Sequence, residues 1–242
     1  MRFKLKAAPT ALRIAVIAMA IVAVFSAANL IYHVVRKPTE LLSPVSGAFN
    51  KSPAETWRHY APLFREYSTA TISPELLAAL AQAEGAGNPV ASTYWRWRLT
   101  WNPFEIYQPA SSSVGMYQMT DPAFAEARHY CIRHHTVVEE GCSLIGLDSR
   151  VLPSRAIELT AVYLDRNVTA ILAQRPNATV SPQHKQQLAT IIHLCGAGQA
   201  KAFARRGFHL IAGERCGDHD VAMYLAQINA MKREFLRFAA DR

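Results

Sequence analysis

The sequence predicts an all-α protein with one globular domain that follows an N-terminal apolar helix. Apolar residues recur at helical spacing through most of the chain, and Ser-Pro or Asp-Pro pairs stand where several of these segments begin. Half of the 242 residues are hydrophobic, which is enough for a sizeable core. A short hairpin in an aromatic segment is the one β structure that we expect.

The N-terminal part is set apart by its hydropathy. Residues 14–35 contain no Lys, Arg, Asp or Glu, and as a helix they would cross a hydrocarbon core about 30 Å thick. Residues 1–13 are basic without an acidic residue, which favours a cytoplasmic N-terminus and an exported C-terminal portion. We therefore expect an uncleaved membrane anchor. The small residues Ser26-Ala27-Ala28 leave a cleaved signal peptide as the alternative.

The net charge of +8 belongs mainly to this N-terminal part. Residues 1–37 contain six basic residues and no acidic one, so residues 38–242 carry 20 basic and 18 acidic residues. No basic stripe with interleaved aromatics is evident, and we expect no nucleic-acid partner. Pro, Gly and Ser predict a linker over residues 36–52, and the globular domain is expected over 53–242.

Helical periodicity and capping residues place the elements of this domain. We expect helices over about 53–67, 74–84, 121–133, 153–174, 182–194, 201–206 and 218–238. Gly196-Ala197-Gly198 interrupts the fifth helix. Residues 88–120 show no sustained period but hold many aromatics, which is typical of a long functional loop.

All four cysteines lie in the portion that we expect to be exported, where disulfides form readily. Of three possible connectivities we prefer Cys131–Cys142 with Cys195–Cys216, because each pair closes a short polar loop. Metal binding with nearby histidines is the alternative, but no spacing matches a zinc module. We expect neither a metal nor another cofactor.

Glu84 is the candidate catalytic acid. It ends the apolar helical run of residues 72–84, directly before a Gly-rich break. Burial among apolar side chains and the negative end of the helix dipole both raise the pKa of a carboxyl. We therefore expect a raised pKa at Glu84, as an acid catalyst at neutral pH requires.

About thirty residues after Glu84 comes the segment Ser113-Val114-Gly115-Met116-Tyr117-Gln118. A helix-end Glu followed by Ser-x-Gly-x-x-Gln resembles the lytic transglycosylases and their relatives, the goose-type lysozymes. Asn88-Pro89-Val90-Ala91 is similar to the family's Asn-Pro-x-Ala, and the Asp220-x-x-x-Tyr224-Leu225 segment is similar to its Glu-Thr-x-x-Tyr-Val. The resemblance covers roughly residues 70–238.

This resemblance implies a lysozyme-like fold and cleavage of peptidoglycan glycan strands between N-acetylmuramic acid and N-acetylglucosamine. Glu84 would protonate the bridging oxygen and then take the proton of the muramyl 6-hydroxyl, which closes on C1 to give a 1,6-anhydro sugar. The family's mechanism uses the substrate's own N-acetyl group. A second carboxylate, as many glycosidases use, would have to be Glu105 or Asp121, and neither has a context that demands the role.

The resemblance also implies a substrate groove. In it Gln118 would hydrogen-bond sugar, Ser113 would lie near the acetamido group and Tyr224 near Glu84. Gly115, Met116 and Tyr117 complete the expected binding residues of the signature. An insertion before Ser113 adds Trp97 and Trp101 as candidates for stacking on sugar rings, the alternative being a self-packed loop.

The chain departs from the family in three places. Met116 and Tyr117 stand for the Leu and Met of the family's Ser-x-Gly-Leu-Met-Gln signature, and Gly85 stands where a Ser commonly follows the catalytic Glu. Leu194-Cys195-Gly196-Ala197-Gly198 replaces Ala-Tyr-Asn-Ala-Gly. We expect a periplasm-facing lytic transglycosylase anchored in the inner membrane, with glycan strands as its substrate. Two alternatives stay open. One is a lysozyme-like hydrolase, in which water attacks, and the other is a murein-binding envelope-assembly protein with little turnover.

Overall fold

The computed structural model describes residues 9–142, 149–175 and 179–241. It is mainly helical, as predicted, and its described residues include three two-stranded antiparallel hairpins. The chain divides into two compact units. The N-terminal unit consists of Met1–Leu41 with Thr93–Ser111, and the C-terminal unit of Leu42–Ser92 with Ser112–Arg242. The aromatic insertion thus belongs with the apolar helix and not with the domain expected over 53–242.

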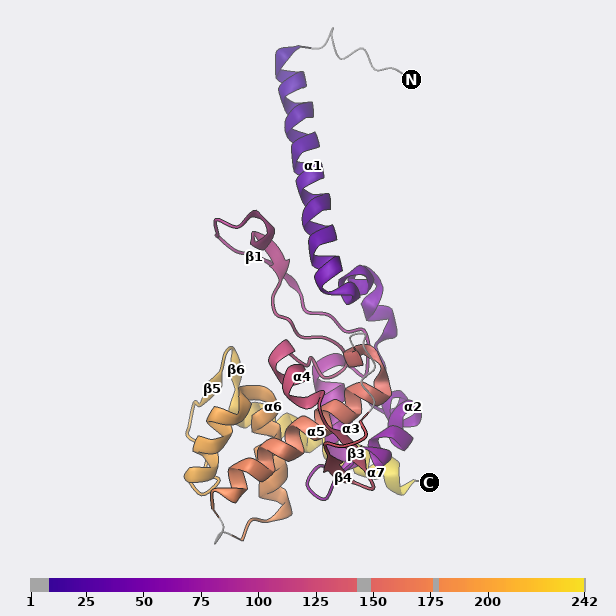
Figure 1. Ribbon diagram of the computed structural model, residues 1–242, viewed down its shortest axis with the longest axis vertical. Helices are drawn as coiled ribbons and strands as arrows, with labels where there is room; N and C mark the ends of the chain where they lie inside the picture. The colour runs from indigo at the N-terminus through magenta and orange to yellow at the C-terminus, as the bar shows by residue number, and fades with distance from the viewer. Residues whose placement is uncertain (1–8, 143–148, 176–178, 242) are drawn as a thin grey trace. The chain divides into compact units, whose positions relative to one another are not determined.

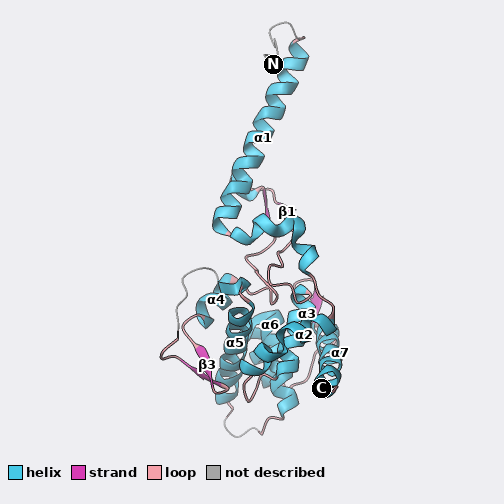
Figure 2. Ribbon diagram, turned by 90° about the vertical axis from the view of Figure 1, so that its right-hand side faces the viewer, coloured by secondary structure: helices cyan, strands magenta, loops and turns pink. Residues whose placement is uncertain are grey.

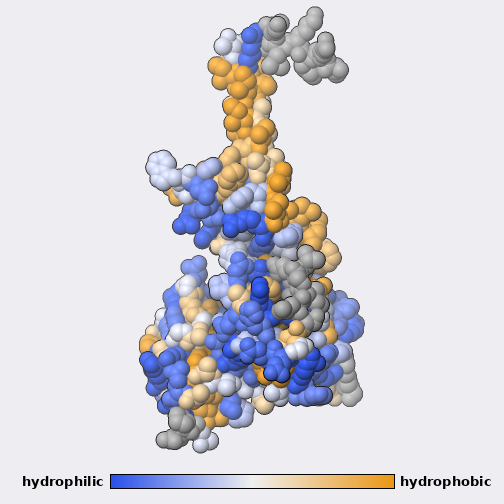
Figure 3. Space-filling view, in the orientation of Figure 1, coloured by the Kyte–Doolittle hydropathy of each residue, from blue (hydrophilic) through white to orange (hydrophobic). Residues whose placement is uncertain are grey.

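The N-terminal unit is built on the helix α1 (Thr10–Arg36), drawn in indigo in Figure 1. An 18-residue window within its 27 residues has a mean hydropathy of 2.5, so α1 is long and apolar enough to cross a membrane, and hydrophobic residues cover the face of α1 seen in Figure 3. The basic residues Arg2, Lys4 and Lys6, which support the expected orientation, lie outside the described residues.

The aromatic segment of this unit forms the expected hairpin. Strand β1 (Trp95–Trp97) pairs with β2 (Tyr107–Pro109), and the 3-10 turn η3 (Pro103–Glu105) lies between them. The remaining residues of the turn region form no regular element.

The stretch over residues 36–52, predicted as a linker, contains regular structure. A 3-10 helix, η2 (Pro38–Phe49), occupies most of that stretch. Near its C-terminal end it is held by the amide of Asn88, which donates to the carbonyl of Ser46 at 2.7 Å and to Oδ1 of Asn50 at 3.0 Å. Composition alone does not show these contacts, because Asn88 lies far along the chain.

The helices of the C-terminal unit lie close together, as Figure 2 shows. In α3 the residues Leu76 to Ala81 are all fully buried, so this helix is enclosed on every side. It packs against α2 and α7, and α5 packs against α6. The helices of this unit are α2 (Pro53–Glu66), α3 (Pro74–Gly85), α4 (Asp121–Ala127), α5 (Pro153–Ala173), α6 (Pro182–Arg205) and α7 (Val221–Ala240).

Local signals set most of these boundaries correctly. The hydroxyls of Ser52, Ser73 and Ser181 each accept a hydrogen bond from the first turn of the helix that follows. Caps of this kind contribute about 1 kcal/mol each. The expected interruption of α6 is also present, because Gly196 has φ 77° and ψ 172°, which no α-helix accommodates.

The helix predicted over 121–133 is too long. It ends at Ala127, and β3 (Cys131–Arg133) then pairs with β4 (Thr136–Val138). His134 and His135 form the connecting turn with φ of 50° and 61°. Two successive positive φ angles are typical of a two-residue hairpin turn, which matches the twist of the strands.

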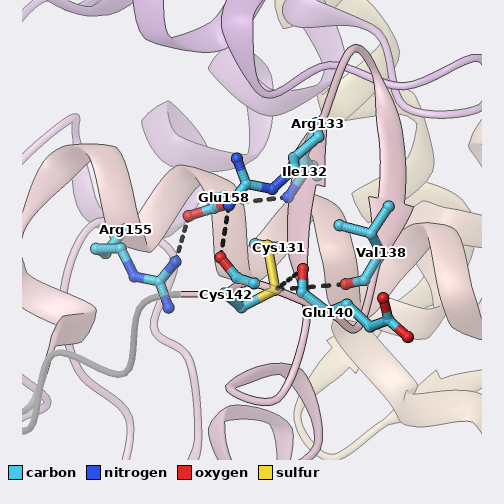
Figure 4. Close-up of a disulfide and its surroundings, with 9 residues drawn as sticks. Cys131, Ile132, Arg133, Val138, Glu140, Cys142, Arg155 and Glu158 are labelled. Atoms are coloured by element: carbon cyan, nitrogen blue, oxygen red, sulfur yellow. Dashed lines mark hydrogen bonds and ion pairs between the residues drawn. A yellow bond between two sulfur atoms is a disulfide. The ribbon is translucent and has the colours of Figure 1, made fainter.

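Two disulfides are present, and they are the preferred pairs. Cys131 and Cys142 bridge with a Cα–Cα distance of 5.6 Å, and Cys195 and Cys216 with 5.4 Å. All four cysteines are therefore occupied, which removes them as metal ligands. The first bridge links β3 to the segment after β4, beside α5. There the carboxylate of Glu158 accepts a hydrogen bond from the backbone N–H of Ile132 at 2.9 Å (Figure 4).

The second bridge closes the segment after α6. That segment holds the two-residue strands β5 (Arg215–Cys216) and β6 (His219–Asp220), which lead directly into α7. The 3-10 turn η4 (Ser149–Val151) precedes α5.

Candidate active site

Glu84 lies in the last turn of α3, where three helices meet. The hydroxyl of Tyr224, in the first turn of α7, donates a hydrogen bond to Oε1 of Glu84. Nε2 of His193, on α6, lies 3.6 Å from the same oxygen. The Glu84 side chain is 21% exposed and that of His193 11%, so the pair lies at the edge of the core with limited access to solvent.

The end of α3 is shaped by a close backbone contact. A Cβ built on Gly85 would lie 2.8 Å from Cα and 2.9 Å from the carbonyl oxygen of Met116. Only glycine fits at this distance without a shift of the Met116 backbone. The contact packs the residue after Glu84 against the Gly115–Gln118 turn, so it brings the two motifs of the resemblance together.

The expectation of a raised pKa at Glu84 is overturned. Burial does raise the pKa of this carboxyl, but the polar contact and charge of His193, the hydrogen bond from Tyr224 and the charge of His219 together outweigh it. The pKa of Glu84 is therefore below the ordinary value of a glutamate. The same pairing and burial raise the pKa of Tyr224 far above its usual range, so this hydroxyl stays a donor.

The Gly115–Gln118 turn has two residues with positive φ and a close approach to the backbone of Arg150. Gly115 has φ +78°, and a Cβ there would lie 2.3 Å from the carbonyl oxygen of Arg150. Gln118 has φ 46°, and its side-chain amide donates to the carbonyls of Ala91 at 3.1 Å and of Gly115 at 2.9 Å. The amide of Gln118 thus closes its own turn and ties it to Ala91.

Two residues of the signature differ from expectation. Met116 is 0% exposed and Tyr117 1%, and the Tyr117 hydroxyl donates to the carbonyl of Leu77 at 3.1 Å. Their side chains lie in the core, where they hold the turn on α3, and do not line a groove. Ser113 is also buried, at 8%. The apolar character of the two middle residues of the signature is the signal that favours this packing role.

Two pockets flank the Glu84–His193 pair. One, of about 340 Å³, has Glu84, Gly85, Asn88 and Ala91 among its lining residues. The other, of about 200 Å³, is lined by Gln118 and His193 among others. Two contacts join a residue that lines one pocket to a residue that lines the other: the Glu84–His193 contact and the hydrogen bond from Gln118 to Ala91. Glu84 therefore lines one pocket, and its neighbour His193 lines the other.

The candidates for a second carboxylate have structural partners. Asp121 pairs with Arg150 at 2.7 Å. Glu105 accepts a hydrogen bond from the side-chain amide of Asn102 at 2.9 Å. It belongs to the N-terminal unit. Trp97 and Trp101 belong to that unit as well, so the structure groups them with α1, whereas Glu84 and Gln118 belong to the C-terminal unit.

Sequence reasoning missed His193 and His219 as neighbours of Glu84. The signal for His193 was its position on an apolar helix directly before the altered Ala-Tyr-Asn-Ala-Gly block, where a polar ring needs a partner. Tyr224 lies beside Glu84, as the resemblance implies. Its contact with sugar, like that of Gln118, stays a prediction.

Neither a scan against models of protein families nor a search of curated proteins finds a match to this chain. The groups around Glu84 therefore provide the grounds for assigning a function.

Proposed function

We propose that the protein is a membrane-anchored lytic transglycosylase with a lysozyme-like domain, which cleaves the bond between N-acetylmuramic acid and N-acetylglucosamine in peptidoglycan. The observation that carries this proposal is the Glu84 carboxyl, which lines one pocket and contacts His193, a residue that lines a second pocket. The charges that lower the pKa of Glu84 belong to His193 and His219. Such a site suits a reaction in which one group acts first as acid and then as base.

The geometry divides the two oxygens of Glu84 between protein and substrate. Tyr224 and His193 both contact Oε1. We assign Oε2 to the glycosidic oxygen of a strand that occupies both pockets, with one sugar on either side of the carboxyl. Because Tyr224 keeps its proton, it holds Oε1 in place in both steps.

The lowered pKa sets a condition on the first step, which needs a proton on Glu84. His193 is the adjacent base, so the Glu84–His193 pair can hold one proton between its two atoms. A bound strand removes water from a carboxyl that is still partly exposed, and this desolvation raises the pKa of Glu84. Substrate binding therefore moves the shared proton onto Glu84, next to the leaving oxygen.

The second step uses the carboxylate that remains. It accepts the proton of the muramyl 6-hydroxyl while that oxygen bonds to C1, and the product is a 1,6-anhydro sugar. No water is consumed. In a hydrolase of the same fold, water would take the place of the 6-hydroxyl and leave a reducing end.

The place of action follows from α1 and the disulfides. We propose that α1 spans the inner membrane with its N-terminus in the cytoplasm, so that the C-terminal unit faces the periplasm. The apolar length of α1 and the two disulfides support this orientation, since disulfides persist in oxidising compartments.

The test is a digest of purified sacculi by the full chain, with Glu84→Gln as the inactive variant and Glu66→Gln, an exposed change on α2, as the matched control. We expect wild type and Glu66→Gln to release muropeptides one water lighter than hydrolysed ends, and Glu84→Gln to release almost none. Reducing ends would identify a hydrolase. Equal release by wild type and Glu84→Gln would remove Glu84 from the mechanism.

A further inference from the structure

We propose that the tip of the aromatic hairpin, residues 97–101, is a membrane-docking surface that enters the outer leaflet of the bilayer spanned by α1. This inference rests on the proposed function only in taking α1 as an uncleaved anchor. It gives Trp97 and Trp101 a lipid partner in place of the sugar expected from the sequence.

The hairpin is fixed to the C-terminal end of α1 by polar contacts. The amide of Asn29 donates to the carbonyl of Tyr107 at 2.7 Å, and Nε2 of His33 lies 2.8 Å from the carbonyl of Phe104. The ring of Tyr32 stacks on that of Phe104 with centroids 4.8 Å apart. Asn29 and His33 are polar residues at the end of an apolar helix, and the hairpin buries both.

These contacts also set the direction of the hairpin. Trp95 lies against the ring of His33, and its indole N–H donates a hydrogen bond to Glu40 at 2.7 Å. Because His33 precedes the end of α1 and Glu40 follows it, Trp95 lies at the level where α1 ends. Trp97 pairs with Tyr107, whose carbonyl meets Asn29, one helical turn closer to the N-terminus of α1. The chain from Trp95 to Trp97 therefore runs back along the helix, as Figure 1 shows for the hairpin beside α1.

The depth of the tip follows from the length of the span. A hydrocarbon core of about 30 Å takes about 20 helical residues, which from Ile14 end near His33. Asn29 and His33 thus lie where the hydrocarbon meets the headgroups. Before the tip, the chain pairs with Tyr107 at the level of Asn29. After the tip, Phe104 contacts His33, so the tip lies close to this same interfacial layer.

The side chains of the tip match that layer. Trp97 is 75% exposed, with its ring partly against that of Tyr107, and Leu99 (105%) and Trp101 (103%) have no cover from the described residues. Tryptophan is enriched at membrane–water interfaces, where its ring is buried and its N–H stays hydrated. Residues 93–104 contain two exposed arginines, Arg96 and Arg98, and no acidic residue, which complements lipid phosphates.

The test uses the full chain in vesicles of phosphatidylethanolamine and phosphatidylglycerol whose acyl chains are brominated near the headgroup. Bromine quenches tryptophan emission only on contact, and no murein is present, so the result is independent of Glu84. The variants are Trp97→Phe/Trp101→Phe and, as the matched control, Trp57→Phe, which removes a tryptophan buried in the C-terminal unit. The mass of the purified chain verifies that α1 is retained, which separates loss of the anchor from failure of docking.

We expect bromolipids to quench wild type and Trp57→Phe alike, and the double variant to lose most of that quenching. Arg96→Gln/Arg98→Gln should reduce the quenching in vesicles with phosphatidylglycerol more than in vesicles without it. Equal quenching of wild type and the double variant would overturn the proposal. So would a result in which soluble glycan fragments, and not bromolipids, change the emission of Trp97 and Trp101.

Discussion

The hydroxyl of Tyr224 donates a hydrogen bond to Oε1 of Glu84, which joins the first turn of α7 to the last turn of α3 across 140 residues of sequence. This bond fixes one oxygen of the carboxyl, and in the proposed mechanism the other oxygen meets the substrate. It also stabilises the charged form of Glu84 and so contributes to the lowered pKa of that side chain.

Tyr224→Phe removes this donor without changing the shape of the residue much. A hydrogen bond to a charged group contributes about 1.5–3 kcal/mol, so we expect the rate of anhydro-muropeptide release to fall roughly 10- to 100-fold. The pKa of Glu84 should rise, which moves the pH–rate profile to higher pH. Tyr60→Phe on α2 is the control, and a profile unchanged by Tyr224→Phe would contradict the assigned role.

His193→Gln removes a larger contribution to the pKa of Glu84, because His193 acts through both a polar contact and its charge. We expect the pKa of Glu84 to rise more in this variant than in Tyr224→Phe. A ¹³C NMR titration of the glutamate carboxyls measures it, with Glu84→Gln assigning the resonance. His59→Gln, at an exposed position of α2, should leave the resonance of Glu84 unmoved.

The lowered pKa of Glu84 also predicts how stability depends on pH. A carboxyl with a depressed folded-state pKa stabilises the fold above its unfolded pKa, and this contribution is lost as pH falls through the folded value. Below about pH 5, wild type should therefore lose free energy of unfolding relative to Glu84→Gln. Urea unfolding of both proteins at several pH values checks this, and a constant difference between them would refute it.

Gly85→Ala tests the contact between the two motifs. The new Cβ would lie 2.8 Å from the Met116 backbone, which must shift to accept it. We expect the free energy of unfolding to fall by about 1–3 kcal/mol, the range for overpacking a core. Gly198→Ala is the matched control, since a Cβ there meets nothing within 4 Å in a helix. It should be neutral or stabilising in the same denaturation experiment.

Features set by neighbouring residues were predictable from the sequence. Ser73 before Pro74 marks the start of α3, and a Gly at position 196 marks the kink in α6, because caps and backbone conformation depend on adjacent residues. The preferred disulfides were confirmed for a similar reason, since each closes a short loop.

Features set by distant residues were not predictable. The 3-10 helix η2 depends on the amide of Asn88, and the pKa of Glu84 depends on His193 and Tyr224. The burial of Met116 and Tyr117 likewise depends on α3. In each case the deciding partner comes from another element, and only the fold brings the two together.

The bridge between Cys195 and Cys216 links the segments that carry the two histidines near Glu84: His193 lies two residues before one cysteine, and His219 three residues after the other. This bridge therefore ties together the two segments that carry these rings. A newly made chain in a reducing cytoplasm lacks that tie. If the proposed function holds, we expect His193 and His219 to take their places beside Glu84 only in an oxidising compartment, so that activity would depend on where the chain folds.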